Sequence, residues 1–80
     1  MKTIRIRYFA AYREAVGTSA EEIATAAGTA AELFEELAHR HPDLERFPGM
    51  RVAVNDELVE WGAALRDRDT VLLFPPVAGG

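Results

Sequence analysis

The chain has 80 residues, of which 49% are hydrophobic and 28% charged, a composition typical of one ordinary domain. A domain of this size buries one small core and has little room for an enclosed active site, so a self-contained enzyme is not expected. The net charge of −4 and the lack of a basic run argue against nucleic acid or an anionic membrane as partner, and favour a basic protein surface.

The first 25 residues predict two strands around a short helix. Residues 2–8 alternate between apolar and polar side chains, which is typical of a half-buried strand. Residues 9–16 have helical spacing, and Gly17 supplies a C-terminal stop. A second strand is expected at 21–25, mainly from its position between a turn and the next helix signal.

The main helix is expected to begin at a capping box. Thr29 and Glu32 have the spacing at which each side chain accepts a hydrogen bond from the other residue's backbone amide. Pro42 should end this helix. Its apolar stripe, which should face the core, consists of Ala30, Leu33, Phe34, Leu37 and Ala38.

After the main helix, residues 43–50 have no regular pattern, and Phe47 is expected to fold back as an apolar plug. Strands at 51–54 and 58–59 should form a hairpin. Asn55-Asp56 suits the turn because both residues tolerate a positive φ.

The final part of the body is a connection over 61–69, with a short helical turn expected near 63–65, followed by an apolar strand at 70–74. The resulting order of elements predicts one α+β domain, residues 1–74, in which one main helix lies across one mixed five-stranded sheet.

Residues 75–80 are expected to form a flexible tail. Pro75-Pro76 cannot donate to a sheet ladder and favours an extended chain, so six residues reach about 20 Å from the body. Gly79-Gly80 has no side chains and fits a narrow channel. The chemistry that suits the Gly80 carboxylate is acyl activation, because glycine does not crowd the attack and has no stereocentre to epimerise.

The chain contains no cysteine, which excludes disulfides and thiolate chemistry on a side chain. If the protein carries sulfur, it must therefore carry it on the carboxyl group of Gly80, as a thiocarboxylate. No segment has the apolar length of a membrane span, and no signal-peptide core is present, so a cytoplasmic location is expected.

The chain resembles the ubiquitin-like β-grasp family, and within it the small sulfur-carrier subunits of molybdopterin synthase. The last seven residues carry the most specific part of the match. One departure is Arg68, where the family commonly has a glycine before the aspartate of a turn. The other matching residues are Phe9-Ala10, Arg13-Glu14, Gly17, Val54-Asn55, Leu58-Val59 and Asp69.

This resemblance implies a division of labour between proteins. An adenylating enzyme related to ubiquitin-activating enzymes would use ATP and magnesium to activate Gly80, and this chain would bind no cofactor itself. The chain agrees, since it lacks a glycine-rich phosphate loop. The thiocarboxylate would then donate sulfur to a cyclic pyranopterin precursor inside the large synthase subunit. The resemblance implies that the tail is threaded into that subunit along Pro75, Pro76, Val77, Ala78, Gly79 and Gly80.

The last strand also predicts a surface for these partners. If Val71 and Leu73 point to the core, alternation directs Leu72 and Phe74 outward, and exposed apolar side chains are typical of contact surfaces. The alternative is that a loop or helix covers them. The resemblance places two further apolar residues near this patch and an arginine at its polar edge, namely Leu58, Phe9 and Arg13.

Other candidates favour structural roles. His39 and His41 point to different faces of a helix end and cannot chelate one metal together, so we interpret them as favourable charges at the helix C-terminus. The carboxylate pairs Glu21-Glu22 and Glu35-Glu36 are interpreted as solvation, and Trp61 as packing.

The sequence leaves three further functions open. The activated Gly80 would equally serve a ubiquitin-like modifier that forms an isopeptide bond with lysine. A sulfur carrier for another pathway, such as that of thiamine, has the same chemistry, although those chains are typically shorter. Finally, the chain could be a plain binding module with an inert tail.

Overall fold

The computed structural model describes residues 1–46 and 48–75. Seven elements follow one another along the chain, and five of them form a single sheet in the order β2-β1-β5-β3-β4. The central strands β1 and β5 are parallel, and the other neighbours are antiparallel. The elements are β1 (Lys2–Tyr8), α1 (Ala11–Val16), β2 (Ala20–Thr25), α2 (Ala30–Arg40), β3 (Arg51–Val54), β4 (Glu57–Val59) and β5 (Thr70–Phe74).

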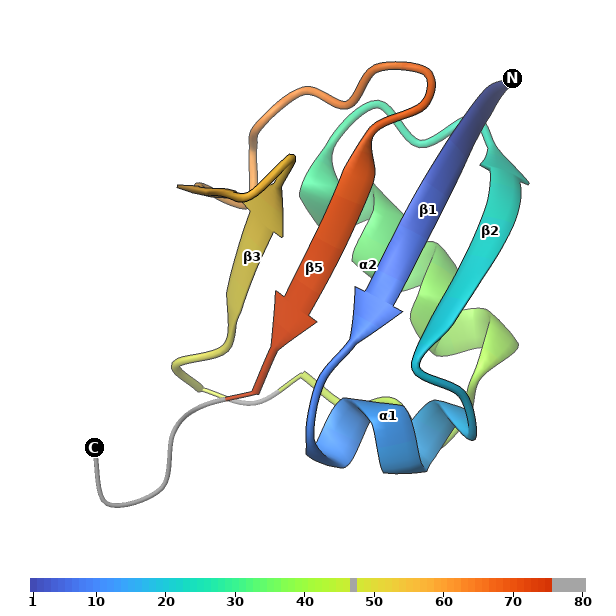
Figure 1. Cartoon of the computed structure of the whole chain (residues 1–80), viewed down its shortest axis with the longest axis vertical. Coiled ribbons are helices and arrows are strands. Elements are labelled where there is room, and N and C mark those ends of the chain that lie inside the picture. The colour runs from blue at the N-terminus through green and yellow to red at the C-terminus, as the bar shows by residue number, and fades with distance from the viewer. Residues whose placement is uncertain (47, 76–80) are drawn as a thin grey trace.

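The main helix α2 lies across one face of the sheet, and the opposite face is turned toward the viewer in Figure 1. Its buried residues are Ala30, Leu33, Phe34 and Leu37, which are the members of the stripe predicted from helical spacing, and Ala38 is partly buried. The strands contribute alternate residues to the same core, with Ile4, Ile6, Val71 and Leu73 at most 1% exposed. The predicted mixed sheet with one main helix is confirmed.

The capping box of α2 is formed as expected. The Thr29 hydroxyl accepts a hydrogen bond from the Glu32 amide at 3.2 Å, and a Glu32 carboxylate oxygen accepts one from the Thr29 amide at 3.1 Å. The same oxygen also accepts the Gly28 amide at 2.8 Å. Three backbone donors that the helix itself cannot satisfy are therefore paired, which fixes where α2 begins.

The short helix α1 begins at Ala11, two residues later than the predicted Phe9. Ala10 has φ 51° and ψ −124°, which a right-handed helix cannot contain, so the chain turns sharply between β1 and α1. The predicted stop is confirmed, because Gly17 has φ 89° and its amide donates to the Arg13 carbonyl.

The β3–β4 hairpin turns at Asn55 and Asp56, whose φ angles of 51° and 69° confirm the predicted turn. Asn55 also joins this turn to the start of β5. Its side-chain amide donates to Asp69 at 2.9 Å, and its side-chain oxygen accepts the Thr70 amide at 3.0 Å. Asp69 in turn accepts the Arg66 amide at 2.8 Å. These bonds hold the first residue of β5 in register with its neighbours.

The prediction of a helical turn near residues 63–65 is wrong. Ala64 instead forms an isolated antiparallel bridge with Thr29. The Leu65 amide donates to the Gly28 carbonyl at 3.0 Å, and the Ala30 amide donates to the Ala63 carbonyl at 3.1 Å. The segment is extended because its backbone pairs with the chain entering α2, a long-range partner that local spacing does not reveal.

Trp61 has the structural role that the sequence favoured. It packs edge-on against Phe34, with ring centroids 5.7 Å apart, and the guanidinium of Arg46 lies over both rings. The predicted plug, Phe47, lies outside the described residues. In the described part of the chain, no helix is long and apolar enough to cross a membrane.

Arg68 occupies a turn conformation that favours glycine, with φ 71°. We expect Arg68→Gly to raise the free energy of unfolding by about 0.5–1 kcal/mol, because removing the Cβ relieves the left-handed strain and offsets the greater freedom of glycine in the unfolded chain. Urea unfolding measures this change. Arg66→Gly is the control, since Arg66 is not among the described residues with positive φ, and it should lower stability. Equal destabilisation by both variants would contradict the prediction.

Candidate functional site

The outer face of the sheet carries apolar side chains that α2 does not cover. Val71 and Leu73 are buried on the helix side, whereas Leu72 and Phe74 alternate to the other face and remain partly exposed. The predicted direction of these four side chains is confirmed. The structure excludes the alternative in which a helix encloses Leu72 and Phe74 in the core, because the main helix lies on the opposite face (Figure 1).

Leu72 and Phe74 form part of an open groove of about 470 Å³. Leu58 is its most exposed apolar residue, with 55% of its surface accessible. The strand register explains how it reaches Leu72: Ala53 of β3 pairs with both Leu58 and Leu72, and paired residues share a face. The described residues that line the groove are Gly49, Arg51, Ala53, Asp56, Leu58, Leu72, Phe74 and Pro75.

Phe9 extends the apolar surface beyond the groove. Its ring stacks on Phe74 with centroids 4.9 Å apart and planes 12° apart, and Arg7 lies over it at 5.8 Å. The structure thus places Phe9 beside Phe74, close to the patch where the family resemblance put it. Arg13 is exposed on α1, four residues after Phe9, but it is not among the described residues that line the groove.

The groove lies where the chain leaves β5. Pro75, the first residue after the strand, is itself part of the groove lining. Anything that binds the groove is therefore held next to the origin of the tail. The other residues predicted to be threaded or activated lie outside the described residues: Pro76, Val77, Ala78, Gly79 and Gly80.

Apart from the apolar groove, a cluster of polar side chains that the sequence did not predict joins β1, β2 and the end of α2. One oxygen of Glu21 accepts a hydrogen bond from the Tyr8 hydroxyl at 2.6 Å and lies 2.7 Å from Nε2 of His41. The Tyr8 and His41 rings also meet edge-on. Burial, followed by the hydrogen bond to Glu21, raises the pKa of Tyr8 well above its ordinary value of 10.0.

The interpretation of the carboxylate pairs as solvation is therefore wrong for one member of each pair. Glu21 binds Tyr8 and His41, and Glu36 accepts a hydrogen bond from the Thr25 hydroxyl while it pairs with Arg40 at 3.1 Å. The Glu36–Arg40 pair has the i,i+4 spacing of a helix, so the sequence could have indicated it. The other contacts join residues of different elements, which no local pattern in the sequence shows. In the described residues, no cluster of three or more histidine or carboxylate side chains could hold a metal ion.

The fold and the groove define a class of protein. A five-stranded mixed sheet with a central parallel pair, one helix across one face and an apolar groove beside the C-terminal segment is the ubiquitin-like β-grasp architecture. A model of the ThiS family matches residues 6–80, and the chain belongs to this family.

Known proteins agree with this assignment. The chain is 39% identical over 80 residues to the molybdopterin synthase sulfur carrier subunit of Escherichia coli (strain K12), covering 96% of this chain and 99% of that one. The solved structure described as molybdopterin converting factor, subunit 1, from Pyrococcus furiosus is 33% identical, with a TM-score of 0.83 over 96% of this chain and 100% of that chain. A protein–protein complex of subunits 1 and 2 of molybdopterin-converting factor from Helicobacter pylori 26695 contains a chain 26% identical, with a TM-score of 0.66 over 98% and 99%.

The raised pKa of Tyr8 predicts a loss of stability in alkali. The folded state favours the protonated hydroxyl. The contribution of Tyr8 to the free energy of unfolding is therefore complete below about pH 10 and declines as the pH rises above it, by up to about 1.4 kcal/mol per pH unit. Urea unfolding at pH 8 to 11 measures the decline. Tyr8→Phe keeps the ring and removes the titrating hydroxyl, so its free energy of unfolding should fall less steeply above pH 10 than that of the parent protein. Parallel curves for the two proteins would show that Tyr8 does not cause the loss.

Proposed function

We propose that this chain is a sulfur carrier for the synthesis of molybdopterin. The observation that carries the proposal is the 39% identity, over nearly the whole length of both chains, to a molybdopterin synthase sulfur carrier subunit. The Gly79-Gly80 end supports it, because an unhindered glycine carboxylate suits activation and transfer. The absence of cysteine leaves the carboxyl group of Gly80 as the place for sulfur.

In this proposal the chain supplies the carried group and the recognition surface, and its partners supply the catalysis. A ubiquitin-activating-like enzyme would adenylate Gly80 with ATP and magnesium, which converts a poor electrophile into an acyl phosphate anhydride. A sulfur donor would displace the adenylate and leave a thiocarboxylate. The large subunit of molybdopterin synthase would then receive the tail and pass the sulfur to the cyclic pyranopterin precursor. A cytoplasmic location, expected from the sequence, belongs to the same proposal.

The groove would serve as the docking surface for both partners. Leu58, Leu72 and Phe74 present apolar area to solvent, and Phe9 stacks on Phe74 to enlarge it. Binding there would hold Pro75, and with it the start of the tail, at the edge of a partner's channel. Arg13, exposed on α1, would contact the partner at the periphery of this surface.

The intact mass of the protein tests the carrier function. After incubation with the adenylating enzyme of the same organism, ATP, magnesium and a sulfur donor, we expect a gain equal to the exchange of one oxygen for sulfur, on the C-terminal peptide. Deleting Gly80, or adding one residue after it, should abolish this gain and leave the free energy of unfolding in urea unchanged within about 0.5 kcal/mol, because changes at the end of a chain usually alter stability little.

The other outcomes identify the alternatives. Stable adducts on lysines of other proteins would favour a ubiquitin-like modifier, and sulfur transfer only to a thiamine precursor would favour that pathway. Full function after deletion of Gly80 would make the tail inert and the chain a binding module.

A substitution at Leu58 tests the docking surface without disturbing the core. Because Leu58 is already 55% exposed, Leu58→Asp should change the free energy of unfolding by less than about 0.5 kcal/mol. It should nevertheless raise the Kd for the large subunit about tenfold or more, because it places a charge where apolar area is buried. Titration calorimetry measures the affinity, with Glu35→Ala on α2 as the control. Unchanged affinity would remove the groove from the interface.

A further inference from the structure

The outer face of the sheet has the opposite charge to the chain as a whole. Three adjoining hollows lie on this face: the apolar groove, a polar hollow of about 370 Å³ between β1, β2 and the start of β5, and one of about 590 Å³ that shares residues with both. Among the described residues, two side-chain carboxylates line the three hollows, whereas four of the nine basic residues of the chain do. The basic residues are Arg5, Arg7, Arg51 and Arg68, and the acidic ones are Glu22 and Asp56. The negative net charge therefore resides on the rest of the molecule.

Two of these arginines flank the apolar groove. Arg7 of β1 is the register partner of Leu72, and Arg51 of β3 is the register partner of Phe74, so each guanidinium shares a face with an exposed apolar side chain. Within the described ranges, neither arginine takes part in an ion pair. The guanidinium of Arg7 lies over the face of the Phe9 ring, which is its one charged or aromatic contact among the described residues. Both positive charges are available to a partner.

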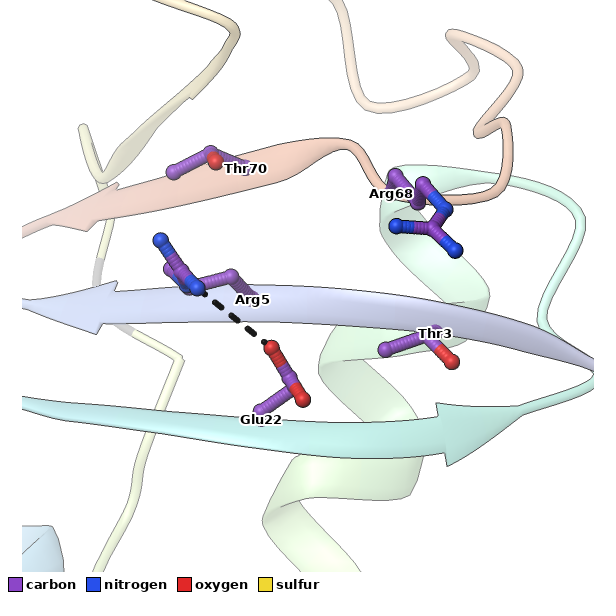
Figure 2. Close-up of a pocket in the computed structure, with 5 residues that line it drawn as sticks. All are labelled: Thr3, Arg5, Glu22, Arg68 and Thr70. Atoms are coloured by element: carbon purple, nitrogen blue, oxygen red, sulfur yellow. Dashed lines mark ion pairs between the residues drawn. The ribbon is translucent and has the colours of Figure 1, made fainter.

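The other two arginines extend the positive field along the sheet. Figure 2 shows Arg5 and Glu22 pointing toward one another across β1 and β2, with Arg68 on the same face beside the start of β5. Nη2 of Arg5 lies 3.5 Å from a carboxylate oxygen of Glu22, and Nε of Arg68 lies 3.9 Å from a carboxylate oxygen of Asp67. All four side chains are more than half exposed. Such pairs are weak and exchange readily for other partners.

We propose that this face binds a protein surface with an apolar centre and an acidic border. The apolar centre fills the groove, and aspartate or glutamate side chains around it pair with Arg7 and Arg51. This inference rests on the proposed function and adds the chemistry of the partner. It reverses the expectation from net charge, which favoured a basic partner, because the charge that matters is the charge of the docking face.

Other occupants fit this face less well. A second copy of the chain would oppose arginines with arginines across a symmetric contact, which is unfavourable. A nucleic acid would place its phosphates against Leu58 and Leu72, which offer no hydrogen-bond donor. An acidic protein surface with an apolar centre satisfies both the arginines and the leucines.

The test is the affinity of the full chain for the molybdopterin synthase large subunit of the same organism, measured by calorimetry. Arg7→Glu and Arg51→Glu should each raise Kd about tenfold or more. Arg66→Glu is the matched control: it makes the same change of charge at an exposed position in the β4–β5 connection that does not line the three hollows, and it should change Kd less than about threefold. Circular dichroism checks that each variant folds.

The salt dependence of the unsubstituted protein gives a second measurement that needs no variant. Raising sodium chloride from about 0.1 M to about 1 M shortens the Debye length from about 10 Å to about 3 Å. Pairing between arginines and carboxylates predicts that binding weakens at high salt. An apolar contact alone would keep or gain affinity.

The outcomes separate the two proposals. Tight binding that Arg7→Glu and Arg51→Glu weaken, and that salt weakens, supports an acidic partner surface. Tight binding that is indifferent to both changes overturns the acidic surface and leaves the sulfur-carrier function intact. No binding by the unsubstituted chain, or self-association through this face, overturns the docking role on which the inference rests.

Discussion

A single helix can cover only one face of a sheet, and the rest of this structure depends on that constraint. The side of the sheet that faces α2 takes Ile4, Ile6, Val71 and Leu73 out of water. In the described part of the chain no second layer covers the side away from α2, so large apolar side chains directed there, such as Leu58 and Leu72, stay at least partly accessible to another protein. The apolar groove around Leu72 is the consequence of this one-sided construction.

The position of the groove depends on the register of β5. Asn55 bonds to Asp69 and Thr70 and so ties the β3–β4 turn to the first residue of the last strand. A shift of one residue would direct Leu72 into the core and Leu73 outward. The same register places Arg51 beside Phe74, so the polar bonds at one end of β5 determine which charges border the apolar surface at the other.

Much of the fold could be predicted from the sequence because its signals are local. The alternation in β1, the Thr29 and Glu32 capping box and the Asn55-Asp56 turn each act through bonds or sterics within a few residues, and each is confirmed. The helical turn predicted near residues 63–65 was wrong because a distant partner intervened. Ala64 pairs with the chain that enters α2, a contact that local spacing does not encode.

The sequence by itself determined the class of fold and the outward direction of Leu72 and Phe74, because periodicity and residue type are properties of the chain. Only the tertiary structure decided that Phe9 stacks on Phe74, that Glu21 joins Tyr8 to His41, and which arginines share the groove's face. The physical reason is that these contacts join residues from different elements, and strand order and register, which no single segment contains, bring them together.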